Sequence, residues 1–458
     1  MEQRYEIPSD PSIEFAKQAL FDELASWLDA SRNRHEGTPW KGVHDEGTFL
    51  TSWREYDILI PDSSAREFAL ERFEAASKWS KEKLPDGYHK RQEVHHGTEH
   101  FTIFLAWLLE IDPGCQPLLD QLWRAALHIV HQGKKRRPWY NFGTNRFTSM
   151  FLGSKRLGRD KLNIVEHLRM VRLAWLGLAR GRQEELEQFI LAYAGEWARQ
   201  IRDSIDVPVF LDDDKGKKKH RQFKKALFTF IGAAPKHLDT RSRSEIHVAN
   251  GTPDLFLHLH EKTGNAVFLD AAERIIAPVH DQLCLPYAHP LGELCWRLQR
   301  EGRLDGLQES IKKARDQYNF LAPGTKISFN PAVNWSSDAF QHFKNAIGMR
   351  NDMARIIMTG ENGKVLPAPL SPGTLVLLHR YTGDERFLVD ALLIARAALG
   401  VYRTLYKDGR FHGCSSRTVS AGCVGHGRNW GAGYVSTALR GLLPGIDTGI
   451  ALPDIPIK

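Results

Sequence analysis

The sequence predicts an all-α fold, an (α/α)6 or (α/α)7 toroid of helical hairpins with long loops, in a single domain over residues 1–458. The first observation behind this prediction is a repeat. The segment "LHEKTGNAVFLDAA" at 259–272 aligns with "LHRYTGDERFLVDA" at 378–391, and looser copies lie at 105–130, 173–194 and 293–314. Repeated helix pairs bury their apolar faces against neighbouring copies, which is typical of a helical-repeat architecture.

The second observation is a difference between the two helices of each copy. The first is apolar all round, as in "FTIFLAWLL" at 101–109, and the second is amphipathic, as in "RFLVDALLIARAAL" at 386–399. A helix that is hydrophobic on every side is buried, whereas an amphipathic helix has one face in solvent. The two patterns together predict an inner and an outer ring of helices.

The two ends of the chain are expected to complete the ring. The segment 429–443 has the inner pattern without a partner, and 11–28 could supply its outer helix. Strand signals are scarce, and the runs at 207–211 and 226–231 predict at most a small β-hairpin. The long loops at 131–147, 203–247, 317–340 and 404–428 each lead into an inner helix, so we expect them to wall a cleft at one end of the toroid.

Composition excludes several classes of protein. The hydrophobic share is 42%, which is ordinary for a globular chain, and no run approaches the roughly 20 apolar residues of a membrane-spanning helix. The first residues show no signal peptide, which favours a cytoplasmic location, or a periplasmic or secreted one if a leader has been removed. The five cysteines form no zinc motif and are expected to be mostly buried thiols, although a Cys414–Cys423 bridge is an alternative.

The chain is basic, with a formal net charge of +7 that comes from clusters at 133–139, 212–225 and 241–244. Such a surface attracts polyanions. No nucleic-acid-binding motif is present, so the expected partner is an acidic polysaccharide or oligosaccharide rather than nucleic acid or a membrane. The run at 215–219 could equally be a solvated loop, and the oligomeric state stays open.

Polar, proton-handling residues stand directly before each apolar helix. In "EVHHGTEHF", 93–101, His96 and His100 are four apart with Glu99 beside them, a spacing that suits hydrogen bonds to a sugar, a helix cap or a metal. Sugar binding is the favoured interpretation. In "RRPWYNFGTNRF", 136–147, Trp139 and Tyr140 offer stacking faces, and Asn141, Asn145 and Arg146 offer amides and a charge.

Further residues come from four other segments. The segment 243–251 brings Arg243, Glu245, His247 and Asn250; 285–293 brings Tyr287 and His289; 330–343 brings Asn334, Trp335, Asp338 and His342; and 423–434 brings His426, Arg428, Asn429, Trp430 and Tyr434. Each histidine alone is more typical of a structural residue. We call each group of polar residues directly before an apolar helix a polar helix mouth. Six such groups in one toroid predict a shared cavity.

Standard cofactor motifs are missing. There is no P-loop, dinucleotide fingerprint, G-x-S-x-G or HExxH, so the sequence predicts no cofactor and no metal.

The hairpins ending in "L-H-x-x-T-G-D-x-x-F-L-x-x-A" resemble the (α/α) toroids of carbohydrate-active enzymes: polysaccharide lyases of the alginate, glucuronan and heparinase kind, unsaturated glucuronyl hydrolases and N-acylglucosamine epimerases. The resemblance covers most of the chain at the level of architecture. It reports the fold rather than the chemistry. No run reproduces the Asn-His signature of the alginate lyases.

The resemblance implies a lyase that cleaves a uronic-acid polysaccharide by β-elimination. In such lyases an Asn, Arg or His neutralises the uronate carboxylate, a base removes the C5 proton, and an acid protonates the leaving O4. The positions that could match are Asn141 or Asn145 as neutraliser, His247 as base, and Tyr434 with Arg428 on the acid side. Asn250, His426 and Asn429 could assist.

Three alternatives stay open at this stage. A hydrolase of unsaturated uronyl oligosaccharides would need carboxylates such as Glu99, Glu245 or Asp338. An epimerase could exchange a proton between His247 and His426. A helical scaffold without catalytic activity would bind polyanions in a salt-sensitive way.

Overall fold

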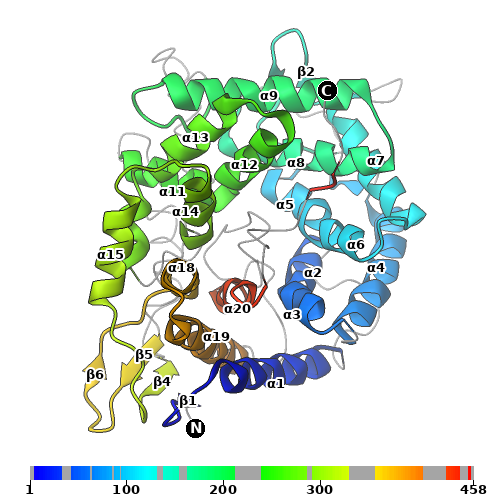
Figure 1. The fold of residues 1–458 in the computed structure, drawn as a ribbon. Helices are drawn as coiled ribbons and strands as arrows, with labels where there is room; N and C mark the ends of the chain where they lie inside the picture. Colours follow the sequence, from blue (N-terminus) through cyan, green and yellow to red (C-terminus); the bar gives the residue numbers. More distant parts are fainter. Residues whose placement is uncertain are drawn as a thin grey trace.

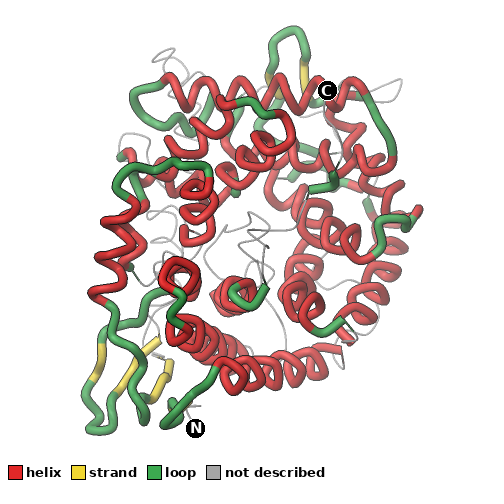
Figure 2. The backbone as a smooth tube through the Cα atoms, viewed as in Figure 1, coloured by secondary structure: helices red, strands yellow, loops and turns green. Residues whose placement is uncertain are grey.

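The computed structural model describes residues 5–32, 43–61, 64–84, 87–92, 94–131, 138–153, 162–211, 239–285, 291–329, 356–405, 430–443 and 452–454. Within these ranges the chain is mostly helical, which confirms the predicted helical class (Figures 1 and 2). None of the described helices combines the length and apolar character needed to cross a membrane.

Outer and inner helical segments alternate along the chain. The outer helices are α1 (Ile13–Arg32), α4 (Ser64–Lys83), α7 (Gln116–Val130), α9 (Glu184–Asp203), α13 (Ala266–Ile276), α15 (Leu307–Gln317) and α19 (Glu385–Leu405). The inner helices are α2 (Val43–Leu50) with α3 (Arg54–Leu59), α5 (Val94–Glu99) with α6 (Ala106–Ile111), α8 (Leu168–Gly177), α11 (Thr240–Asn250) with α12 (Thr252–Thr263), α14 (Leu291–Arg300), α18 (Pro372–Thr382) and α20 (Trp430–Arg440). A π-helical turn, His100–Leu105, joins α5 to α6.

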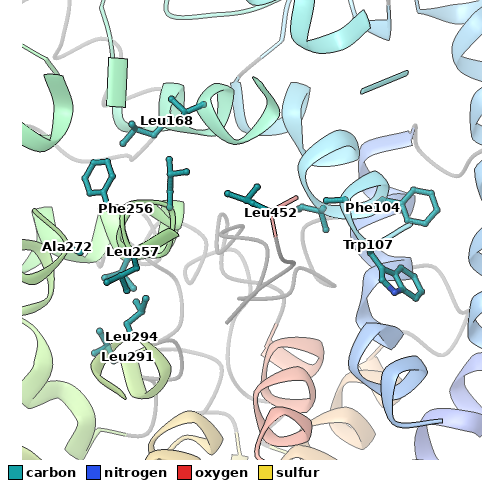
Figure 3. Close-up of a cluster of buried hydrophobic side chains, with 14 of the residues drawn as sticks. Phe104, Trp107, Leu168, Phe256, Leu257, Ala272, Leu291, Leu294 and Leu452 are labelled. Atoms are coloured by element: carbon teal, nitrogen blue, oxygen red, sulfur yellow. The ribbon is translucent and has the colours of Figure 1, made fainter. Parts of the chain in front are cut away.

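The inner helix α8 is buried on all sides, as its apolar pattern predicts. Every residue of α8 is buried, whereas α7 buries one stripe and leaves the opposite face in solvent. Figure 3 shows the packing between inner helices, where Leu257 of α12 lies near Leu291 and Leu294 of α14. Burial of this apolar surface is the main stabilising term of the fold.

Inner helices contact one another in sequence around the molecule. The series α14, α18, α20, α3 is continuous, α2 meets α5 and the π-helical turn, and α5 meets α8. The ribbon in Figure 1 shows the same circular order. The sequence predicts α1 as the outer partner of α20, and the structure differs. The helix α20 packs chiefly against α19 and α18, and α1 also packs chiefly against α19.

The helices between residues 43 and 83 were missed by the sequence pattern. Here α2 and α3 form a broken inner segment and α4 the outer helix that follows. The break at the 3-10 turn Thr51–Trp53 interrupts the apolar periodicity. The outer helix α4 is rich in charge, and its hairpin lacks the Thr-Gly turn that marks the two closest copies of the repeat.

The Thr-Gly repeat forms the same hairpin turn twice. Thr263 Oγ1 donates to Leu259 O over 2.6 Å, and Thr382 Oγ1 donates to Leu378 O over 2.7 Å. The glycines that follow, Gly264 and Gly383, have φ of 65° and 72°. A helix that ends in the left-handed region strongly favours glycine, because other residues pay a steric cost there. The repeat therefore encodes a helix stop.

The β content exceeds the small hairpin that was expected. A four-stranded antiparallel sheet has the order β1 (Tyr5–Glu6), β4 (Lys326–Phe329), β5 (Ile356–Thr359), β6 (Val365–Leu366), and β2 (Tyr140–Asn141) pairs with β3 (Arg146–Phe147). The segments expected to be loops at 131–147 and 317–340 thus contain strands. The run at 207–211 pairs with 163–165 through an isolated bridge, Ile164 to Phe210, and 226–231 lies outside the described residues.

The segment 452–454 crosses the C-terminal ends of two inner helices. Trp175 Nε1 of α8 donates to Pro453 O over 3.1 Å, and Lys262 of α12 pairs with Asp454. Leu452, labelled in Figure 3, is buried. Of the cysteines, Cys115, Cys284 and Cys295 are free thiols, of which only Cys295 is fully buried, and Cys414 and Cys423 lie outside the described residues.

Candidate functional site

Three inner segments from distant parts of the chain meet at Arg169, on the first turn of α8. Arg169 Nε donates to Asn250 Oδ1 over 2.8 Å, and its Nη1 lies 3.8 Å from Glu99 Oε1. Asn250 ends α11 and Glu99 ends α5. All three side chains are more than nine-tenths buried. The structure thus brings together two of the expected polar helix mouths, those at 93–101 and 243–251.

One turn further along α8, Arg172 extends this cluster. Its Nη2 donates to Asp254 Oδ2 of α12 over 2.5 Å. Arg297 of α14 donates to the other oxygen of Asp254 over 2.8 Å and to Glu261. One buried carboxylate therefore serves two arginines. Removing a partner from a buried ion pair leaves a costly unpaired charge, which explains why these helices are held in fixed register.

A cavity of about 10 Å³, room for about one water molecule, opens between these helices. Its lining residues are Thr102, Leu168, Arg169, Arg172, Asn250, Gly251, Thr252 and Leu255. Arg172 is 5% exposed, and its Nη1 has no hydrogen-bond partner among the described residues. A buried guanidinium N–H without a partner costs free energy until an acceptor fills it, and at this cavity the acceptor can be a water molecule or one oxygen of an anionic group.

His247, the expected base, points away from this cavity. Its Nε2 lies 2.7 Å from Pro208 O, and its ring packs edge-on against Trp197 of the outer helix α9. Complete burial lowers its pKa to about 4. The expectation that it faces a shared hollow is wrong, because the ring fills the space between the inner and outer layers.

Trp139 and Tyr140 are buried, so the expectation of exposed stacking faces is also wrong. Trp139 meets the ring of Tyr88 at 4.8 Å, and Tyr140 meets the ring of Phe189 at 4.7 Å. Burial raises the pKa of Tyr140 to about 12. These aromatic rings form the core under the β2–β3 hairpin.

The polar residues of that hairpin hold it against the outer helix α9. Asn145 Nδ2 donates to Ala192 O over 3.1 Å, and Tyr140 Oη donates to Asn145 Oδ1. Arg146 donates to Asn145 O and to Glu196 of α9. Asn141 is exposed, and its Oδ1 accepts the Thr144 N–H within the turn. None of these described contacts reaches the arginine cluster, and Figure 1 shows β2 on the far side of α9.

The remaining expected residues are placed as follows. His96 is partly buried in α5, and His100 is buried at the first position of the π-helical turn. Glu245 is buried and accepts a hydrogen bond from Gln282 over 2.7 Å. Tyr434 and Trp430 belong to α20, where only the backbone of these two residues is described. Arg428, His426, Asn429, Tyr287, His289, Asn334, Trp335, Asp338 and His342 lie outside the described residues.

A second buried ion cluster joins α3, α14 and α20. Arg440 donates to Glu55 Oε1 over 3.1 Å and to Glu293 Oε2 over 2.5 Å, and all three side chains are buried. Burial raises the pKa of Glu293, whereas Arg440 and Arg54 lower that of Glu55 against the effect of burial. This cluster therefore joins the first inner segment of the chain to the last inner helix.

The sequence carries a signal for the arginines that the helix-mouth pattern misses. Arg169 and Arg172 stand three apart in "HLRMVRLAWL", an otherwise apolar helix. A charged residue is almost never fully buried without a partner, so an arginine in such a helix predicts an ion pair or a ligand. The same argument applies to Arg440 in "STALRGLL".

Comparison with known proteins found no matching family model, no matching curated protein and no matching solved structure. Across the residues that the structure describes, no three His, Cys, Asp or Glu side chains gather closely enough to hold a metal ion.

Proposed function

We propose that the chain is a carbon–oxygen lyase that cleaves a uronic-acid-containing polysaccharide by β-elimination, built on a closed (α/α)7 toroid. The alternation of outer and inner segments and the circular order of inner contacts support the toroid. The net charge of +7 supports an acidic polymer such as alginate or glucuronan.

The observation that carries the proposal is the Arg172 guanidinium at the inner cavity. Its unpartnered Nη1 and the neighbouring Arg169 lie where three inner helices meet. The cavity has room for one oxygen atom, so one oxygen of the uronate carboxylate would occupy it and accept from Nη1. Arg172 then takes the neutraliser role first expected of Asn141 or Asn145, and Asn250 assists by fixing Arg169.

Neutralisation matters because the C5 proton of a uronate is barely acidic while the carboxylate keeps its charge. A fixed cation stabilises the enolate that develops as the proton leaves, and fixed donors in a dry site need no reorganisation during the reaction. In this proposal Tyr434, with Arg428, supplies the proton transfers, since a nearby cation lowers the pKa of a tyrosine from about 10.

Incubation with alginate, glucuronan and glycosaminoglycans tests the proposal directly. A lyase creates a C4–C5 double bond, so the ultraviolet absorbance of the solution rises. No water is added to the products, which distinguishes their mass from that of hydrolysis products. We expect a rise on at least one uronan and none on the carboxyl-reduced polymer. New reducing ends without absorbance would indicate a hydrolase, a product of unchanged mass an epimerase, and salt-sensitive binding without turnover a scaffold.

A further inference from the structure

A second, larger cavity lies between the outer helices α4 and α7 and the π-helical turn. Its volume is about 520 Å³, within the range of small-molecule sites. It is lined by Ser77, Ser80, Lys81, Leu84, Gly87, His100, Phe101, Gln121, Arg124, Ala125, Leu127, His128 and His131. It shares no lining residue with the arginine cavity. The π-helical turn contributes to both, with Thr102 at the arginine cavity and His100 and Phe101 at this one.

The polar lining contains two cations, three histidines, and the side chains of Ser77, Ser80 and Gln121, which can donate and accept hydrogen bonds. Lys81 and Arg124 stand on the two flanking helices, His100 lies buried at the inner end, and none of the lining residues is an aspartate or a glutamate. Leu84 and Phe101 contribute an apolar wall. This combination fits a molecule with one anionic group and an apolar body, because charge-assisted hydrogen bonds orient the anion while the body leaves water.

The backbone around the cavity is also unusual. His100 begins the π-helical turn, and such turns inside α-helices occur frequently at functional sites. Gly87 has φ of 83°, and the Phe101 ring lies 3.5 Å from where its Cβ would stand. The positive φ favours glycine at this position, while a Cβ there would only make ordinary van der Waals contact with the Phe101 ring at the cavity wall.

We infer that this cavity binds an organic anion, a carboxylate or phosphate ester with an apolar or aromatic body. The inference does not depend on the proposed function. A carboxylate and a phosphate ester present the same kind of anionic group, and competition separates the two.

The test uses 8-anilinonaphthalene-1-sulfonate, an anionic aromatic dye, titrated into the folded full-length protein. We expect saturable fluorescence with one site, displaced by phenyl phosphate if the natural ligand is a phosphate ester and by benzoate if it is a carboxylate. Ser80→Trp fills the cavity and should weaken binding at least about tenfold. Lys78→Trp, on the exposed face of the same helix, should leave it unchanged.

If Ser80→Trp does not fold, two double variants that each remove two positive charges decide the question. Lys81→Gln with Arg124→Gln should weaken dye binding several-fold, whereas Lys78→Gln with Lys83→Gln, outside the cavity, should not. No saturable binding, or equal affinity in the cavity and control variants, overturns the inference. Displacement by neither competitor, with binding lost in the cavity variants, still supports an anion site.

Discussion

Arg169 and Asn250, 81 residues apart in the chain, are joined by a 2.8 Å hydrogen bond from Nε to Oδ1. Asn250 is otherwise bound to Val165 O over 3.0 Å, so one amide ties α11 to α8 and to the turn before it. This bond shows how residues at separate helix mouths become neighbours.

Replacing Asn250 by alanine should destabilise the protein. The change removes the buried hydrogen bonds that Arg169 Nε donates and that Val165 O accepts, at a cost of about 2–3 kcal/mol in the free energy of unfolding. Chemical denaturation measures it. Asn141→Ala is the matched control, because Asn141 is exposed and bonds only within its turn, and it should cost less than about 1 kcal/mol. Equal costs would contradict the account.

The triad of Arg440, Glu55 and Glu293 gives a second prediction. Arg440→Met leaves two buried carboxylates without their shared cation, and we expect a loss of about 3–5 kcal/mol in unfolding free energy. A triple variant that adds Glu55→Gln and Glu293→Gln removes both charges and should recover part of the loss. A triple variant less stable than Arg440→Met would show that the arginine acts by packing alone.

The Thr-Gly turn predicts that replacing its glycine by alanine destabilises the protein more than the same change at a glycine with extended backbone. Gly383→Ala should lower the unfolding free energy by about 1 kcal/mol, because φ is 72° and alanine is strained there. Gly181 is the control: its backbone is extended, and nothing lies within 4 Å of the point where a Cβ would stand. Thermal melts compare the two. Similar shifts in Tm would mean that the left-handed cap is not the reason for the glycine.

The pH dependence of stability should reflect His247. Its pKa falls from 6.5 to about 4 on folding because burial disfavours the charged ring. The contribution of His247 to the free energy of unfolding is therefore fully present above pH 6.5. It is lost as the pH falls towards 4, which lowers the stability by about 3 kcal/mol. His247→Gln keeps a donor for Pro208 O without titrating, so its stability should fall less over that window. Asp390, whose pKa rises to about 6, acts in the opposite direction in both proteins and cancels in the comparison.

The helical class and most hairpins could be predicted from sequence because they depend on local signals. The apolar helix α12, the Gly264 stop and the amphipathic helix α13 are each readable within a short window. The short strands could not, since β1 and β4 pair residues about 320 positions apart in strands of two to four residues, far below the length that periodicity needs.

The site was predicted less well, because burial is a property of the whole fold. Trp139 and Tyr140 lie in a segment with loop composition, yet aromatic neighbours from α7 and α9 cover them. His247 lies in α11, within a segment expected to be a loop, and its orientation depends on the packing of Trp197 and on a carbonyl at Pro208. Sequence order places a residue on a helix; its direction comes from tertiary packing.

The most direct test of the central claim is the affinity for a uronate oligosaccharide and for its carboxyl-reduced form, in the native protein and in Arg172→Met. We expect the native protein to prefer the uronate by about tenfold to a hundredfold, as a charge-assisted hydrogen bond predicts, and the variant to lose that preference. Asp254 keeps Arg297 as its partner in the variant, so its charge stays paired. A preference for the uronate that is unchanged in Arg172→Met would contradict the account.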